Sequence, residues 1–222
     1  MKQFVILLTL AVLAPFAAAS GKADNESYKV EAIGELKEAK VAETIRGALE
    51  AKGLRIITDK GKAVCEVWFR KDIPTTKDEV PGANFGQIPE GTFMGVINFP
   101  ANVSDYRGQG IKAGFYTLRF GLILQDGNHL GVSPARDFLL LCPINEDKDP
   151  NVQIKSEDLI KLARTAAGTG HPSPWSLAPP TSDKDLPRIV KNEHEHVILE
   201  TKISTKSGPV AIGFIVIGRT EG

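Results

Sequence analysis

The 222-residue sequence has little cysteine, no excess of charge of either sign and no long apolar segment after its N-terminus. Lysine and arginine number 27, and aspartate and glutamate also number 27. A chain without net positive charge has no electrostatic reason to bind nucleic acid or an anionic membrane. The sequence also lacks the Gly-rich phosphate loop of nucleotide-binding proteins and the G-x-S-x-G turn of serine hydrolases. These absences argue against nucleic-acid binding, nucleotide binding and serine hydrolysis.

The one long apolar run lies at the N-terminus, over residues 4–13, and Ala17-Ala18-Ala19 follows it with a small-residue cleavage site. This is the pattern of a secretory signal peptide, and the run is shorter than the roughly 20 apolar residues of a transmembrane helix. We therefore expect a signal peptide over residues 1–19, cleaved near Ala19, and a periplasmic or extracellular protein. We expect a disordered leader over residues 20–27, and no membrane span in the mature chain.

Only two cysteines occur, Cys65 and Cys142. Two cysteines in an exported protein can form a disulfide, and both lie in segments expected to be strands. Free cysteine, however, is among the most buried residue types. The sequence leaves a disulfide and two separate buried thiols as open alternatives.

Short segments rich in β-branched and aromatic residues recur along the chain and are separated by turn residues. They cover residues 28–33, 54–58, 63–71, 92–99, 115–124, 137–142, 196–204 and 210–218. Most of them are joined as hairpins, which predicts a mainly β protein. We expect a single domain over residues 28–222, an antiparallel β-sandwich of Ig-like or jelly-roll-like type.

Two segments follow helical spacing instead and predict one or two peripheral helices. The first covers residues 35–52 and is closed by Gly53, and the second runs from Ser156 to Gly168. Proline and glycine concentrate at residues 72–91 and 168–188, which predicts long loops there. Within the second loop, Trp175 and Leu177 are expected to anchor the chain to the body of the domain.

Residues 105–143 contain the densest set of polar side chains between two expected strands, and we expect a ligand-binding site there. The candidate residues are Asp105, Arg107, Asp126, Asn128, His129, Arg136 and Asp137. His129 is suited to acid/base chemistry or to metal binding. The alternative is a loop that stabilises itself, in which Arg136 pairs with Asp105 or Asp137 and Asp126 accepts backbone N–H groups.

A second candidate is the pair His194 and His196, which share a face if the segment is a strand. A His-x-His pair can bind zinc or copper, provided that a third ligand such as His171 or His129 comes from elsewhere. The alternative is a solvated strand face. Separately, Trp68, Trp175 and Tyr106 could form an aromatic platform for sugars, although each is more simply a packing residue.

Three pieces of the sequence resemble a group of uncharacterised secreted bacterial proteins. They are Glu66-Val67-Trp68, the run from Asp105 through Gly114-Phe115-Tyr116-Thr117-Leu118-Arg119, and the run from Gln125 through Arg136-Asp137-Phe138. The resemblance implies export and a common fold, and it supplies no catalytic residues. In addition, the Gly114-Phe115-Tyr116 sequence resembles the start of an Ig-like strand, where a tyrosine hydrogen bonds back to the chain.

Together these features favour an exported, non-catalytic binding or structural module without a cofactor, with an unknown ligand or protein partner. The alternative is a metal-dependent or acid/base enzyme that uses the cluster at residues 126–137. An enzyme of this kind requires His129, Arg136 and a carboxylate such as Asp105 or Asp126 to converge in one pocket. A binding module requires an apolar or aromatic groove.

Overall fold

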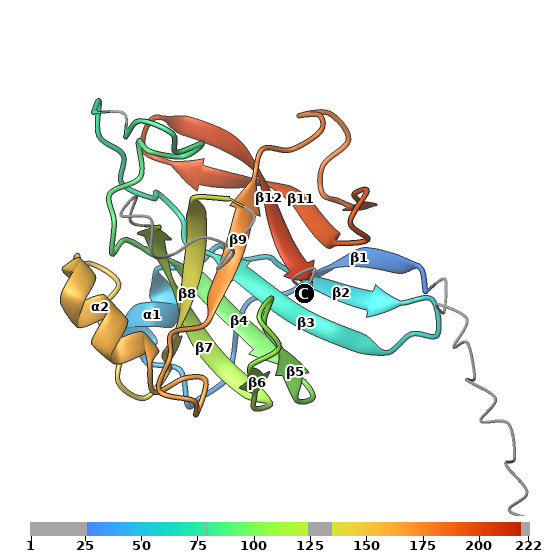
Figure 1. Cartoon of the computed structure of the whole chain (residues 1–222), viewed down its shortest axis with the longest axis horizontal. Coiled ribbons are helices and arrows are strands. Elements are labelled where there is room, and N and C mark those ends of the chain that lie inside the picture. Colours follow the sequence, from blue (N-terminus) through green and yellow to red (C-terminus); the bar gives the residue numbers. More distant parts are fainter. Residues whose placement is uncertain (1–25, 79, 124–134, 219–222) are drawn as a thin grey trace, which may run out of the picture.

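The computed structural model describes residues 26–78, 80–123 and 135–218. Within these ranges one large sheet contains ten strands, and every neighbouring pair is antiparallel (Figure 1). In sheet order the strands are β1 (Tyr28–Ile33), β2 (Gly53–Thr58), β3 (Ala63–Phe69), β4 (Phe93–Phe99), β7 (Gly114–Leu122), β8 (Asp137–Pro143), β9 (Pro174–Ala178), β12 (Gly208–Ile217), β11 (Val197–Thr205) and β10 (Arg188–Lys191).

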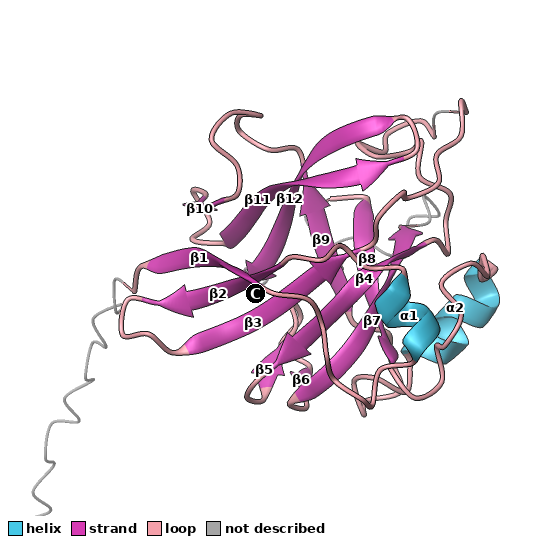
Figure 2. Ribbon diagram, turned by 180° about the vertical axis from the view of Figure 1, so that it is seen from behind, coloured by secondary structure: helices cyan, strands magenta, loops and turns pink. Residues whose placement is uncertain are grey.

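Three kinds of element lie outside the large sheet. The strands β5 (Val103–Ser104) and β6 (Gly110–Ile111) form a two-stranded sheet of their own. The helices α1 (Glu43–Gly47) and α2 (Ser156–Ala163) lie on the same side of the large sheet, near β7 and β8 (Figure 2). None of the helices in the described part of the chain has the length and apolar character needed to cross a membrane.

The eight strands expected from the sequence are present, with ends that differ by at most two residues. Their alternation decides which side chains are buried, because successive residues of a strand point to opposite faces. In β3, Cys65, Val67 and Phe69 enter the main core, whereas Trp68 packs on the other face. On that other face Glu66 accepts hydrogen bonds from Arg55.

The large sheet curls until its two edge strands lie near each other, which makes it nearly barrel-shaped. The ammonium nitrogen of Lys191 on β10 lies 5.8 Å from the ring centroid of Tyr28 on β1. The mainly β, antiparallel class expected from the sequence is therefore confirmed. The described strands of the large sheet follow one continuous order, and a division into the two packed sheets of a sandwich is not confirmed.

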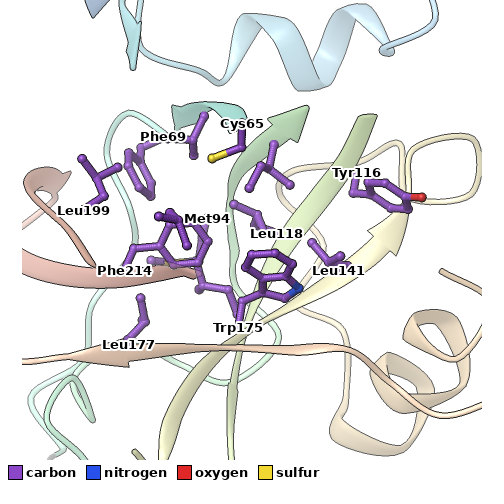
Figure 3. Packing of buried hydrophobic residues seen from close by; sticks show 14 of the residues in the cluster. Cys65, Phe69, Met94, Tyr116, Leu118, Leu141, Trp175, Leu177, Leu199 and Phe214 are labelled. Carbon is purple, nitrogen blue, oxygen red and sulfur yellow. The ribbon is translucent and has the colours of Figure 1, made fainter. Parts of the chain in front are cut away.

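The main core lies inside this curled sheet and draws side chains from both of its halves. Phe69 and Met94 come from one half, and Leu199 and Phe214 come from the other (Figure 3). Trp175 of β9 packs beside them, with its ring centroid 6.2 Å from that of Phe214. Each large apolar side chain buried in this way contributes about 1.5–3 kcal/mol to stability. The two halves are therefore held together by a single core.

The helix expected over residues 35–52 is much shorter than predicted, because only Glu43–Gly47 is helical. Ala42 provides no side-chain cap at its N-terminus. Ile45 is buried from the helix, whereas Leu36, Val41 and Leu49 are buried from the irregular segments on either side of it. Gly53 was expected to end the helix, but it begins β2. A Cβ atom at Gly53 would lie 2.4 Å from the indole nitrogen of Trp68, so close packing requires glycine there.

The second helix begins at Ser156 as predicted, but it ends at Ala163 rather than at Gly168. The Pro-rich segment 168–188 is also more ordered than expected, because Pro174–Ala178 forms β9. This short strand pairs with β8 on one side and with β12 on the other. Trp175 and Leu177 are buried and anchor the segment, as the sequence indicated.

The hydrogen bond expected at the start of β7 is present. The hydroxyl of Tyr116 donates to the carbonyl oxygen of Lys112 at 2.9 Å. Burial raises the pKa of Tyr116, which keeps this hydroxyl protonated as a donor. The bond fixes the corner between β6 and β7.

The disulfide alternative does not agree with the structure, because Cys65 and Cys142 are both free, buried thiols. Cys65 belongs to the main core, whereas Cys142 packs with Leu159 and Ala163 of α2 on the outer face. The thiols therefore lie on opposite faces of the sheet, where they cannot bond without movement of the backbone.

Candidate functional site

Asp105 is buried and stabilises its own turn. Its carboxylate accepts hydrogen bonds from the backbone N–H groups of Arg107 at 3.0 Å and Gln109 at 2.8 Å. The side-chain amide of Gln109 also donates to it at 2.7 Å. Asp105 therefore positions Arg107, whose own side chain is exposed.

Asp137 is also buried, and it holds a different part of the chain. One of its oxygens accepts from the backbone N–H of Asn84 at 2.8 Å, and the other accepts from that of Phe85 at 2.9 Å. These bonds fix the loop at residues 72–91 against the start of β8. The contacts of Asp137 therefore show that it orders this loop.

Arg136 pairs with neither of the carboxylates expected for it. Its guanidinium donates to the carbonyl oxygens of Ile123, at 3.2 Å, and Pro81. The prediction of an Arg136 ion pair with Asp105 or Asp137 is therefore wrong, because backbone carbonyls on both sides already satisfy this side chain.

The seven candidate residues do not form one site in the described part of the chain. Asp105 and Arg107 are held by the segment around Pro172, to whose carbonyl oxygen Gln109 donates at 3.2 Å. Arg136 and Asp137 lie where β7 ends and β8 begins, with Asp137 paired with Leu122, and their hydrogen bonds go to the loop at residues 72–91 and to Ile123. The other three candidates, Asp126, Asn128 and His129, lie outside the described residues.

The imidazole rings of His194 and His196 do lie together, with centroids 5.7 Å apart. They belong to a turn before β11 rather than to a strand. Asn192 shapes this turn by accepting hydrogen bonds from the backbone N–H groups of both histidines. Among the described residues no group of three or more His, Cys, Asp or Glu side chains could hold a metal ion. The expected third ligand, His171, lies instead at the groove described below.

The aromatic platform is also not formed. Trp175 is buried in the main core, and Trp68 is buried in the outer cluster beside α1, where its indole N–H donates to the carbonyl oxygen of Gly34 at 2.8 Å. Tyr106 lies against the ring of His196. The two tryptophans pack on opposite faces of the sheet and cannot bind one sugar together.

Arg119 forms a buried ion pair that the sequence analysis missed. Its guanidinium is fully buried and donates to both oxygens of Asp147, at 2.8 and 2.5 Å. It also donates to the carbonyl oxygens of Gly91, Asp149 and Val152. The signal was a lone arginine within an apolar strand, since a buried charge has to be paired. All its donor positions are occupied, so this cluster is structural.

The strongest candidate for a ligand site is a groove of about 250 Å³ between α2 and the outer face of the sheet. Apolar side chains form most of its walls: Leu122, Ile123, Phe138, Leu140, Leu159, Ile160, Pro172 and Pro174. Arg107, Arg164 and His171 add basic groups, and Glu90 and Ser156 add polar groups. We refer to this feature as the α2 groove.

Arginine contacts distinguish the α2 groove from the rest of the described surface. Six of the eight described arginines donate side-chain hydrogen bonds to other parts of the protein: Arg46, Arg55, Arg70, Arg119, Arg136 and Arg188. Within the described residues, Arg107 and Arg164 make no side-chain hydrogen bond or ion pair, and both line the α2 groove. Two guanidinium groups are therefore available to a ligand at this place.

A second hollow, of about 360 Å³, adjoins the α2 groove and shares Glu90, Leu122 and Ile123 with it. Arg136 lines this second hollow, so two of the predicted site residues, Arg107 and Arg136, border neighbouring concave surfaces. The sequence analysis did not identify Arg164 or the wall that α2 provides.

Comparison with known proteins gives no relationship, since no protein-family model, no curated protein and no solved structure matches the chain.

Proposed function

We propose that the chain is an exported, non-catalytic binding module whose ligand lies in the α2 groove. The observation that carries the proposal is the convergence of Arg107 and Arg164, with unpaired side chains, on one apolar groove. Ligand sites are typically concave and mostly apolar, with a few polar groups that fix the orientation of the ligand. The α2 groove has this composition.

The non-catalytic part of the proposal is supported by the contacts of the carboxylates. A general acid or base needs a carboxylate or imidazole that can reach the substrate. Asp105 and Asp137 are each occupied by N–H donors of nearby loops, and Asp147 is occupied by Arg119. Glu90 accepts from the hydroxyl of Ser156 at 3.3 Å. The imidazole that remains at the groove, His171, stands with Arg107 and Arg164, and we assign these three basic groups to holding a ligand.

Export is proposed from the N-terminal pattern, in which a short apolar run precedes Ala17-Ala18-Ala19. The β-sandwich also stays part of the proposal, in the sense that two halves of the sheet enclose one core as two facing sheets do. An extracytoplasmic binding module needs a rigid body of this kind to hold a preformed groove.

Expression of the full 222-residue sequence in a bacterium tests the first half of the proposal. We expect the protein in the exported fraction, with an N-terminus at Ser20 by mass spectrometry. A cytoplasmic protein that retains residues 1–19 would contradict export.

Binding of the neutral fluorophore N-phenyl-1-naphthylamine to the purified protein tests the second half. We expect a saturable rise in emission with one site per chain, because the groove is apolar. Ile160→Trp fills the groove and should abolish the signal. Lys161→Trp adds the same indole at an exposed position of the same helix and should leave it unchanged. No binding, or equal binding by both variants, would reject the groove as the site.

A further inference from the structure

We infer that the α2 groove takes a single-chain amphiphile with one terminal carboxylate and an acyl chain of medium length. This inference rests on the proposed function and adds the chemical class of the ligand. It combines three properties of the groove: two free guanidinium groups at one end, an apolar wall, and an acidic group at the other end.

The basic end of the groove is built by a network of hydrogen bonds. Thr169 donates to the side-chain oxygen of Gln109 at 2.5 Å, and Gln109 donates to Pro172. These bonds join the turn that carries Arg107 to the segment that carries His171. Arg164 follows the last residue of α2 and precedes the same segment. Three basic side chains from separate turns therefore meet at the C-terminal end of α2.

A carboxylate suits this end in both charge and shape. The planar fork of a guanidinium matches the two oxygens of a carboxylate, and charge-assisted bonds of this kind are about twice as strong as neutral ones. The other described arginines already use their donors within the protein, as Arg119 does with Asp147. Arg107 and Arg164 have their donors available for an anion from solution.

The apolar wall sets the length of the ligand. The helix α2 has eight residues, and at a rise of about 1.5 Å per residue it spans roughly 12 Å, close to the length of an extended chain of about eight carbons. Phe138 and Leu140 of β8 form the floor along this distance, and Leu159 and Ile160 of α2 form the side. A linear acyl chain can contact these apolar side chains along the whole length of the helix.

Glu90 fixes the direction of the ligand. It lies at the N-terminal end of α2, where it accepts from Ser156 and, at 3.4 Å, from the backbone N–H of Leu122. A second negative charge on the ligand would be repelled there. The ligand is therefore a monoanion, with its carboxylate between Arg107 and Arg164 and its uncharged tail towards Glu90.

Calorimetric titration of the full chain with octanoate, octanol, octylamine and octyl phosphate tests the inference. We expect octanoate to bind at least 10-fold more tightly than octanol, with octylamine weakest. Tighter binding of octyl phosphate than of octanoate would replace the carboxylate of the inference with a phosphate. Shortening the chain from octanoate to hexanoate should weaken binding about 15-fold, because each buried methylene contributes about 0.8 kcal/mol.

The double variant Arg107→Gln/Arg164→Gln should lose at least 10-fold in octanoate affinity and keep its affinity for octanol. Arg55→Gln, which removes an arginine from a distant strand, is the matched control and should bind octanoate as the parent chain does. Equal affinity for octanoate and octanol, or a double variant that binds octanoate normally, would overturn the inference that the ligand is a carboxylate. The groove would remain a binding site in either case. If neither these amphiphiles nor N-phenyl-1-naphthylamine binds, the proposed function fails as well.

Discussion

Arg119 and the pair Arg107 and Arg164 carry the same guanidinium group, but the fold surrounds them differently. Arg119 is fully buried, and a carboxylate and three carbonyl oxygens accept its hydrogen bonds. Arg107 and Arg164 are exposed and have no such partners in the described residues. This difference in hydrogen-bond partners distinguishes Arg119, which stabilises the protein, from Arg107 and Arg164, which are available to a ligand. It also gives a practical rule, since the contacts of a charged residue say more about its role than its type does.

The largest effect expected from this comparison is on stability at Arg119. The substitution Arg119→Met leaves Asp147 buried with only the hydroxyl of Thr117 as a partner. We expect a loss of about 3–5 kcal/mol in the free energy of unfolding, measured by urea denaturation. Arg55→Met, which breaks the half-buried pair with Glu66, should cost less, about 1 kcal/mol. Equal losses would mean that burial does not distinguish the two pairs.

Asp137 was predicted to bind a ligand, and its substitution tests whether this buried carboxylate stabilises the protein instead. In Asp137→Ala the N–H groups of Asn84 and Phe85 lose their acceptors, so we expect a loss of about 1–3 kcal/mol. Faster proteolysis within residues 72–91 should accompany it. Asp78→Ala removes an exposed carboxylate from the same loop and is the control. A stable, protease-resistant Asp137→Ala variant would show that its bonds do not order the loop.

The comparison extends to groups that the fold keeps uncharged. Burial raises the pKa of Cys65 from 9.0 to about 12 and also raises the pKa of Cys142. Above pH 9 the unfolded thiols lose protons that the folded ones keep. The free energy of unfolding therefore keeps the full contribution of the protonated thiols below pH 9. Above pH 9 it decreases by about 1.4 kcal/mol per pH unit for each thiol.

Unfolding measured in urea between pH 8 and pH 11 should show this decrease. Cys65→Ala should remove about half of the slope that the two thiols produce, whatever its effect at pH 8. A variant with the parent slope would place the titrating group elsewhere, for example at Tyr28, whose pKa is also raised to about 12.

The smallest effect is expected at the groove. Arg107→Gln and Arg164→Gln remove charges that hold no other part of the described protein, so each should change stability by less than about 0.5 kcal/mol. Thermal unfolding of the unliganded variants measures this. A loss above about 1 kcal/mol would show that these arginines are structural after all, and the contrast with Arg119 would disappear.

The sequence predicted the strands well because their signal is local. In β3, for example, the local alternation is the one found in the structure, with Cys65 and Val67 on one face and Trp68 on the other. Two of the failures arose from tertiary packing. The apolar spacing at residues 35–52 was compatible with a helix, but the same residues are buried mostly without one. The strand β9 has a Pro-rich sequence, and its pairing depends on β8 and β12.

The candidate site was only partly predictable for a related reason. Turn residues such as Asp105 and Asp137 look alike in sequence whether they bind a ligand or their own backbone. Only the positions of Gln109 and Asn84 show that both carboxylates are occupied. Arg164 gave no signal, because a basic residue at the end of a helix is common. Its proximity to Arg107 comes from the path of the chain after α2.

The strand order has a consequence for how the protein folds. Most neighbouring strands of the large sheet also follow one another along the chain, with only the small β5-β6 hairpin inserted between β4 and β7. The one exception among the described strands is the pairing of β9 with β12. Contacts between nearby segments form early, because their loops cost little entropy to close. The sheet can therefore grow strand by strand from β1, while the β11-β12 hairpin forms independently. The short pairing of Leu177 with Phe214 then closes the structure as a late step in folding.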